Sequence, residues 1–219
     1  MKYSKIDSNL FIKNRKNFVN KLESNSVAFF NSNDIYPISA DSVLPFEQHR
    51  DIFYLSGIDQ EESILVLFPQ SNNENYKEML FIRETNDHIT HWEGEKLTKN
   101  QARDISGINN VHWLGEFDDI LKILVKEADF VYINTNEHYR QNVETQTRED
   151  RFIEKLKTIG GIKFKKSNPI LQKQRSIKDD IEIELIKKAC DITKKGFERI
   201  LKFIKPGVWE YEIEAELSH

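Results

Sequence analysis

Residues 63–68 restrict the fold of this 219-residue chain more than any other segment. Their sequence, SILVLF, is almost continuously apolar and is followed by Pro69. An uninterrupted apolar run of this length is typical of a strand that is covered on both faces. After a polar turn at 71–75, residues 78–82 predict a second strand, so the two segments form a hairpin. The chain therefore needs helices on both sides of a sheet.

Helix and strand patterns alternate along the first 166 residues. An amphipathic helix is predicted from about residue 6 to 22, because Phe11, Phe18 and Leu22 lie on one face. Further strands are predicted at 26–30, 111–114, 130–133 and 162–164, and further helices at 97–105, 117–128 and 148–159. This alternation favours an α/β domain over residues 1–166, with a mixed β-sheet flanked by helices.

The pattern changes after residue 166. Residues 167–178 are predicted to be a linker, although Pro169 can open a short helical segment. A long helix follows, with Asp179 as its N-cap and Glu182 completing a capping box. Gly196 lies on the apolar stripe of this helix and predicts close approach of another element. A second helix begins near residue 209. Residues 179–219 are therefore expected to be the opening helices of a second, incomplete domain.

The bulk composition narrows the class of protein. Hydrophobic residues make up 38% and charged residues 31%, which is typical of a globular protein with a core. The net charge of −4 gives no reason to expect nucleic acid as a partner. No segment has the ~20 apolar residues of a membrane span. Cys190 is the single cysteine, so no disulfide can form within the chain. The predicted location is therefore the reducing cytoplasm.

Two stretches, followed by a short turn motif, resemble the aminopeptidase P (Xaa-Pro aminopeptidase) branch of the creatinase/prolidase superfamily. Residues 44–57 are similar to the segment YPFRQ-x-SDFYYLTG of that family, with these positions matched: Pro45, Phe46, Gln48, Asp51, Tyr54, Leu55 and Gly57. Residues 175–189 resemble the opening of the catalytic domain. Residues 206–214 are similar to a G-x-T-E-x-E turn in which Trp209 replaces the threonine. Glu47 and Arg50 depart from the family pattern, and Arg50 with Asp51 is expected to join a polar network near Tyr54.

The resemblance implies a creatinase/prolidase-like N-terminal domain followed by the first helices of a truncated pita-bread domain. In the family, two divalent metals, usually Mn²⁺, are bound by two Asp, one His and two Glu. Those ligands come after the G-x-T-E-x-E turn, so no catalytic or metal-binding residue is expected in this segment. The implied parent is a dimetal Xaa-Pro aminopeptidase that acts on proline-containing peptides. This part of it is expected to be inactive alone, to restrict substrate access and to support a homo-oligomer.

Two alternatives remain open at this stage. The parent could be a metal-free creatinase-like binding or interaction protein, since members of the superfamily have lost their metals. It could also be a prolidase (Xaa-Pro dipeptidase), which shares the architecture but differs in substrate. The metal ligands of the parent would separate the first alternative from an enzyme.

Trp92 and His91 are the candidate contact residues. They lie in a polar segment, residues 87–94, between the predicted hairpin and the next helix. In the family, an aromatic loop residue of this domain can approach the active site of another subunit, and Trp92 would correspond to it. The alternative is that Trp92 only covers the edge of the sheet. His91 and the nearby His88 lack a third ligand in the sequence and are interpreted as surface or interface histidines rather than metal ligands.

Overall fold

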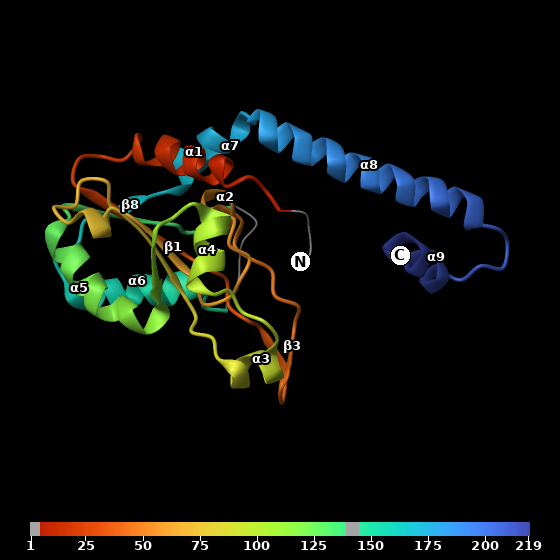
Figure 1. Ribbon diagram of the computed structural model, residues 1–219, viewed down its shortest axis with the longest axis horizontal. Helices are drawn as coiled ribbons and strands as arrows, with labels where there is room; N and C mark the ends of the chain where they lie inside the picture. Colours follow the sequence, from red (N-terminus) through yellow and green to blue (C-terminus); the bar gives the residue numbers. More distant parts are fainter. Residues whose placement is uncertain (1–4, 139–144) are drawn as a thin grey trace. The chain divides into compact units, whose positions relative to one another are not determined.

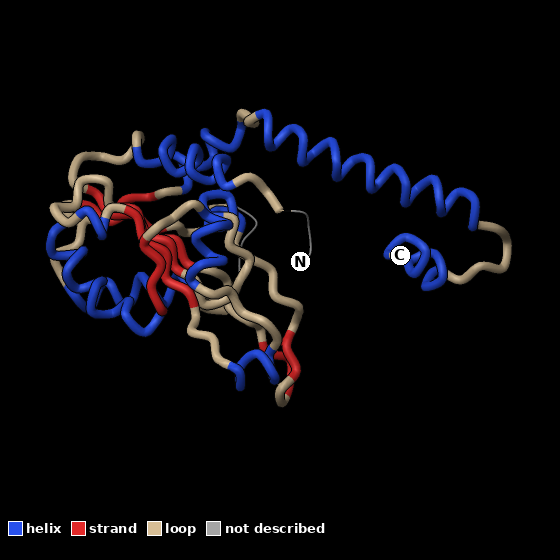
Figure 2. Tube along the Cα trace, in the orientation of Figure 1, coloured by secondary structure: helices blue, strands red, loops and turns tan. Residues whose placement is uncertain are grey.

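The computed structural model describes residues 5–138 and 145–219. They divide into two compact units, unit 1, which ends at Ser176, and unit 2, which begins at Ile177. Unit 1 contains a six-stranded sheet with the strand order β6-β5-β4-β1-β7-β8. The strands are β1 (Ser26–Asn31), β4 (Ile64–Leu67), β5 (Glu78–Ile82), β6 (Asn110–Trp113), β7 (Phe130–Ile133) and β8 (Phe164–Lys166). Strand β4 is antiparallel to both of its neighbours, and the other pairs are parallel. The predicted mixed sheet is confirmed (Figures 1 and 2).

Helices cover both faces of this sheet. One hydrophobic cluster combines Ala28 and Phe30 of β1 with side chains of α1 (Ser8–Val19), α2 (Arg50–Ser56), α4 (Lys99–Ser106) and α7 (Asn168–Ser176). The other combines Val27 and Phe29 with α5 (Phe117–Glu127) and α6 (Arg148–Ile159). Because successive side chains of a strand point to opposite faces, β1 contributes to both cores.

The predicted helices of unit 1 match the observed ones closely, and their termini explain why. Thr98 caps α4 in a capping box with Gln101. Helix α6 ends at Gly160, which adopts a φ of 76°. The hairpin is formed by β4 and β5, with Ile64 opposite Phe81. These agreements follow from local signals that packing did not override.

Several segments differ from the sequence-based expectation, and one of them is α2, for which no helix was predicted. Residues 37–43 form a separate two-stranded sheet, β2 (Pro37–Ser39) and β3 (Ser42–Val43), which was not predicted. Residues 87–93 form a short helix, α3 (Asp87–Glu93), instead of a loop. Most of the predicted linker 167–178 is helix α7, which packs on unit 1 through Leu171, a residue that is 1% exposed. Burial of Leu171 explains why this segment folds with the first unit.

Unit 2 consists of α8 (Asp180–Phe203) and α9 (Glu210–Ser218). The predicted capping box of Asp179 and Glu182 is present. The two helices approach closely at Gly196, where an added Cβ would lie 2.9 Å from Cδ1 of Leu217. No residue of α8 or α9 is buried, and large apolar side chains of α8 such as Ile192 and Leu201 are 71% and 74% exposed. Among the described residues, no helix is long and apolar enough to cross a lipid bilayer.

A buried arginine joins the helices to the sheet. Arg15 of α1 is 1% exposed and donates from Nε to Oε1 of Glu78 at 2.5 Å and from Nη1 to the carbonyl of Leu55 at 2.7 Å. It therefore connects α1 with β5 and α2. A buried charge is tolerated only while it is paired, because its desolvation is costly.

We expect Glu78→Ala to destabilise the chain by about 2–3 kcal/mol, because it leaves the buried guanidinium of Arg15 without a carboxylate. The measurement is urea denaturation of the 219-residue chain. Glu74→Ala is the matched control, since Glu74 is exposed and pairs with Lys77 on the surface; its expected cost is below about 1 kcal/mol. Equal effects of the two variants would show that the buried pair contributes no more than a surface one.

Glu116 gives a pH-dependent prediction. A hydrogen bond with His112 and one from the amide of Trp113 lower the pKa of Glu116 to about 2. A lowered carboxyl pKa stabilises the fold above the unfolded-state pKa, near 4.5, and this contribution disappears as the pH falls toward 2. Glu116→Gln should thus lower the urea concentration at the denaturation midpoint at pH 7. The difference between the midpoints of wild type and variant should become smaller below pH 4.5. A gap that stays constant to pH 2 would contradict this assignment.

Candidate functional site

Helix α3 presents the predicted contact residues to solvent. Its N-cap, Asn86, accepts a hydrogen bond from the amide of Ile89 at 2.9 Å, and its C-cap, Gly94, has a φ of 83°. Trp92 is 73% exposed. The imidazole of His91 lies edge-on to the indole at a centroid distance of 5.0 Å. The structure thus brings His91 and Trp92 together on an exposed helix, and the indole does not act as a cover for the sheet edge.

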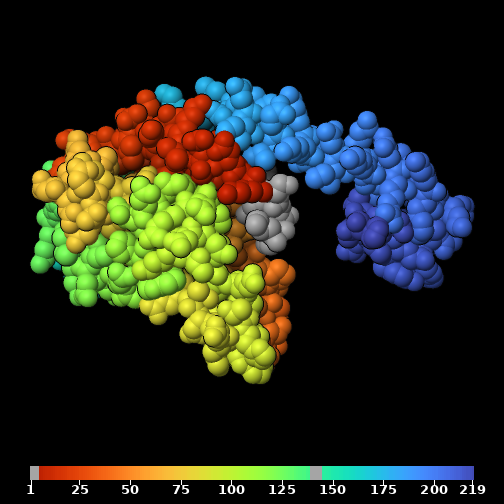
Figure 3. All heavy atoms as spheres, in the orientation of Figure 1, coloured from red at the N-terminus to blue at the C-terminus, as the bar shows by residue number. Residues whose placement is uncertain are grey.

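The β2–β3 hairpin adds further exposed apolar side chains. Five large ones are at least one-third exposed: Ile35, Tyr36, Ile38, Val43 and Leu44. Figure 1 draws this hairpin and α3 at the same end of unit 1, and Figure 3 shows atoms of both segments there. We call these five residues and Trp92 the exposed apolar tip. A cluster of exposed apolar side chains is a candidate surface for contact with a partner or a ligand.

The hairpin part of this tip was not predicted from the sequence. Its turn consists of Ala40 and Asp41, and Ala40 adopts a φ of 49°. Hairpins with two-residue turns favour Asn-Gly or Asp-Gly, so the local signal was weak. The alternation of Tyr36 with Ile38 was the sequence feature that could have revealed it.

A buried polar cluster lies where β1 and β7 end. Asn134 follows β7 and donates from its side-chain Nδ2 to Oδ2 of Asp51 at 3.1 Å. Its backbone amide donates to Oε1 of Glu149 at 3.1 Å. Asn31, the last residue of β1, donates to Oε2 of Glu149 at 2.8 Å. Burial raises the pKa of Glu149, and burial lowers the pKa of His49, the N-cap of α2. The carboxylates of this cluster are occupied by contacts within unit 1.

The same cluster holds α7 in place. Nη1 of Arg175 lies 2.5 Å from Oδ1 of Asp51, and the guanidinium stacks over Tyr54 at 5.5 Å. Gln174 donates to the carbonyl of Asn14 at 2.8 Å. The expected polar network near Tyr54 therefore exists, but its cation is Arg175, whereas Arg50 is exposed. This ion pair directly connects the two sequence stretches that resemble aminopeptidase P. The contacts assign the cluster a structural role.

Residues 5–138 and 145–219 contain no group of three or more His, Cys, Asp or Glu side chains arranged to hold a metal ion. His112 has other contacts: it stacks on Phe81 at 5.2 Å and bonds to Glu116 at 3.0 Å. The described residues therefore do not fit the dimetal centre of the family.

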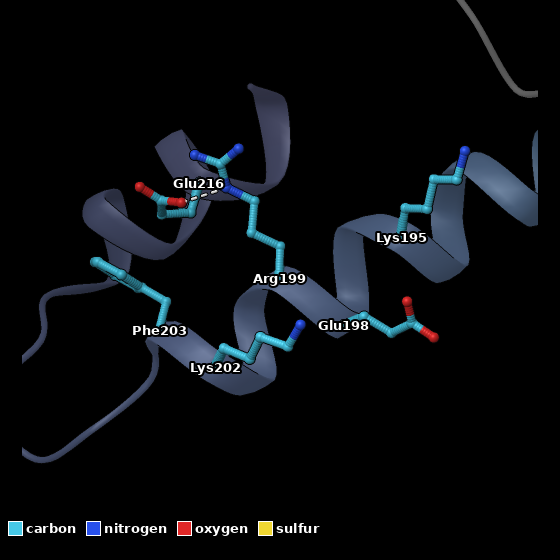
Figure 4. A pocket seen from close by; sticks show the side chains of 6 residues that line it. All are labelled: Lys195, Glu198, Arg199, Lys202, Phe203 and Glu216. Carbon is cyan, nitrogen blue, oxygen red and sulfur yellow. Dashed lines mark hydrogen bonds and ion pairs between the residues drawn. The ribbon is translucent and has the colours of Figure 1, made fainter.

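Unit 2 has one shallow pocket of note, between the second half of α8 and α9 (Figure 4). Arg199 crosses it and pairs with Glu216 at 2.5 Å, and the lining residues are Lys195, Glu198, Arg199, Lys202, Phe203 and Glu216. All of these groups lie on an open surface, so the pocket offers no secluded site for chemistry.

Comparisons with known proteins agree with this architecture. The sequence profile of the aminopeptidase P N-terminal domain matches residues 11–132, and that of metallopeptidase family M24 matches residues 184–219. An Xaa-Pro aminopeptidase from Escherichia coli is 26% identical over 99% of this chain and 49% of its own length. Human Xaa-Pro aminopeptidase 3 is 25% identical over 85% of this chain and 37% of its own length.

A solved structure assigned to aminopeptidase P, from Bacillus anthracis, superposes with a TM-score of 0.87. It is 27% identical, with 97% of this chain and 51% of that chain covered. The chain spans half or less of the length of the curated relatives it matches. The profile of the N-terminal domain covers more than half of the chain, and the sheet topology places that domain in unit 1. The chain therefore belongs to the aminopeptidase P family, of which it carries the N-terminal domain and the beginning of the M24 region.

Proposed function

We propose that this chain is the N-terminal portion of a dimetal Xaa-Pro aminopeptidase, which removes the N-terminal residue from peptides with proline in second position. The observation that carries the proposal is the order of the two profile matches, with the N-terminal domain at 11–132 followed by M24 at 184–219. The names of the relatives supply the substrate class.

The metals of such a parent would supply the hydrolytic chemistry, and the described residues offer no ligand group for them. We therefore propose that the two Mn²⁺ ions bind in a part of the M24 domain beyond the 184–219 match. A set of exposed apolar side chains on α8, with Ile186, Phe197 and Leu201, is proposed to pack against that domain. Its exposure supports this role, because a helix with a sustained apolar face needs a partner surface.

Unit 1 is proposed to restrict access of substrates and to support a homo-oligomer. The exposed apolar tip supports this role, since it combines an accessible indole with a hairpin that is too small to be stable by itself. Trp92 is the proposed contact to peptide or to a neighbouring subunit. The free, exposed thiol of Cys190 suits a reducing compartment, and we propose a cytoplasmic location.

The test is a peptidase assay with an Xaa-Pro tripeptide and added Mn²⁺, on this chain and on the polypeptide that also contains a complete M24 domain. We expect release of the first residue only from the longer protein, because the described residues hold no metal group. Activity of the short chain would contradict the assignment of the chemistry. No activity in either protein would favour a metal-free interaction protein.

In the longer protein, Trp92→Ala should raise KM for the tripeptide by about tenfold with little change in kcat, because a lost binding contact acts on substrate affinity. Trp92 is 73% exposed, so stability should hardly change. Steady-state kinetics with a thermal unfolding scan measures both effects. Trp209→Phe is the matched control, because Trp209 is a similarly exposed indole of unit 2. An unchanged KM in Trp92→Ala would contradict the contact role.

A further inference from the structure

The segment that carries Trp92 is closed at its base by a short stretch of the chain, residues 60–62. Arg83, directly after β5, places Nε 3.2 Å from Oε2 of Glu62 and Nη1 3.6 Å from Oε1 of Glu61. At the other end of the segment, Lys96 lies 2.6 Å from Oε1 of Glu61. The amide of Leu97 donates to Oε1 of Gln60 at 2.7 Å. Both ends of residues 83–97 are thus held by the same short stretch, and Glu61 contacts both ends.

This base is well protected from solvent. The Glu61 side chain is 8% exposed and that of Lys96 is 13% exposed. An ion pair shielded to this degree is much less screened by salt than a surface pair. The base is therefore a stable platform for whatever the segment presents.

Helix α3, in contrast, has no buried residue. Seven residues are also too few for a helix to be stable through its own hydrogen bonds. Ile89 is only half-buried, so apolar packing holds this helix less than it holds the other helices of unit 1. Another interaction must keep it folded and in place.

The geometry supplies that interaction at the last residue of α3. Glu93 forms a bidentate pair with Arg83, with Oε2 2.7 Å from Nη1 and Oε1 2.8 Å from Nη2. These hydrogen bonds raise the pKa of Arg83 and lower the pKa of Glu93. Two parallel hydrogen bonds fix orientation as well as distance, which a single contact does not.

We propose that Arg83 and Glu93 are positioning residues that hold α3 at the end of β5 and so fix the direction in which Trp92 is presented. Glu93 is adjacent to Trp92 in sequence, so a change in the backbone torsion angles at Glu93 also moves Trp92. The Trp92 part of this inference rests on the proposed function, whereas the part concerning α3 stands on the contacts alone. Neither residue touches a reacting group, and both act through Trp92.

The first experiment measures amide hydrogen exchange of residues 86–93 in the 219-residue chain. Glu93→Gln keeps the shape of the side chain but removes its charge, and we expect exchange in α3 to become about tenfold faster. Arg83→Lys keeps the charge near Glu61 and Glu62 but loses the bidentate geometry, and it should have a similar effect. Strand β5 should exchange at its wild-type rate in both variants.

Glu95→Gln is the matched control, because Glu95 is exposed, lies two residues from Glu93 and should leave exchange in α3 unchanged. Since Glu93 is 43% exposed, 0.5 M NaCl should accelerate exchange of α3 in wild type and have little effect on Glu93→Gln. The double variant, Arg83→Lys with Glu93→Gln, should show exchange in α3 that is no faster than in either single variant. Wild-type exchange in Glu93→Gln would overturn the proposal.

The second experiment uses the longer protein and the Xaa-Pro tripeptide. We expect Glu93→Gln to raise KM with kcat nearly unchanged, and to have no further effect when Trp92 is already alanine. A raised KM in Trp92→Ala but not in Glu93→Gln would overturn the positioning role. If Trp92→Ala itself left KM unchanged, the contact role of Trp92 would fail, and the exchange data would still decide whether the ion pair holds α3.

Discussion

Burial of β1 on both faces is the constraint on which the rest of unit 1 depends. All six of its residues are buried, and the strand lies between an antiparallel neighbour, β4, and a parallel one, β7. Phe30 packs against Phe18 of α1 on one side, while Phe29 packs against Phe152 of α6 on the other. A polar or smaller residue in this strand would disturb two cores at once. Helices on both faces are therefore a requirement of the sequence of β1.

Polar contacts then fix the helices to one another and to the sheet. Arg15 joins α1 to β5 and α2, and Arg175 joins α7 to α2 through Asp51. Each pair connects segments that are more than 60 residues apart in sequence. Such pairs cost desolvation energy and give little net stability, but they allow few alternative arrangements. This explains why unit 1 extends to Ser176, beyond the last strand.

The parts that the sequence predicted are those in which local pattern and burial agree. Strands β1, β4 and β5 and helices α5 and α6 carry apolar residues at the spacing of the element that they form. Helix α7 was assigned to a linker because its burial rests mainly on Leu171, which no periodic pattern announces. Helix α3 and the β2–β3 hairpin have no buried residue, and the single alternation of Tyr36 with Ile38 is too short a hydrophobic period to predict a strand. Trp92 could be identified as a candidate, but its dependence on Arg83, nine positions earlier, requires the coordinates.

The molecule therefore contains elements held by two different forces. The helices that cover the sheet are held by apolar burial, which salt hardly affects, whereas α3 is held by a partly exposed ion pair. An element of the second kind can change position without disturbing either core, because it contributes no side chain to them. Evolution can alter such an element at little cost in stability. The base of the segment, formed by Glu61 and Lys96, is by contrast shielded from solvent, so its ion pair is less sensitive to salt than the pair that holds α3.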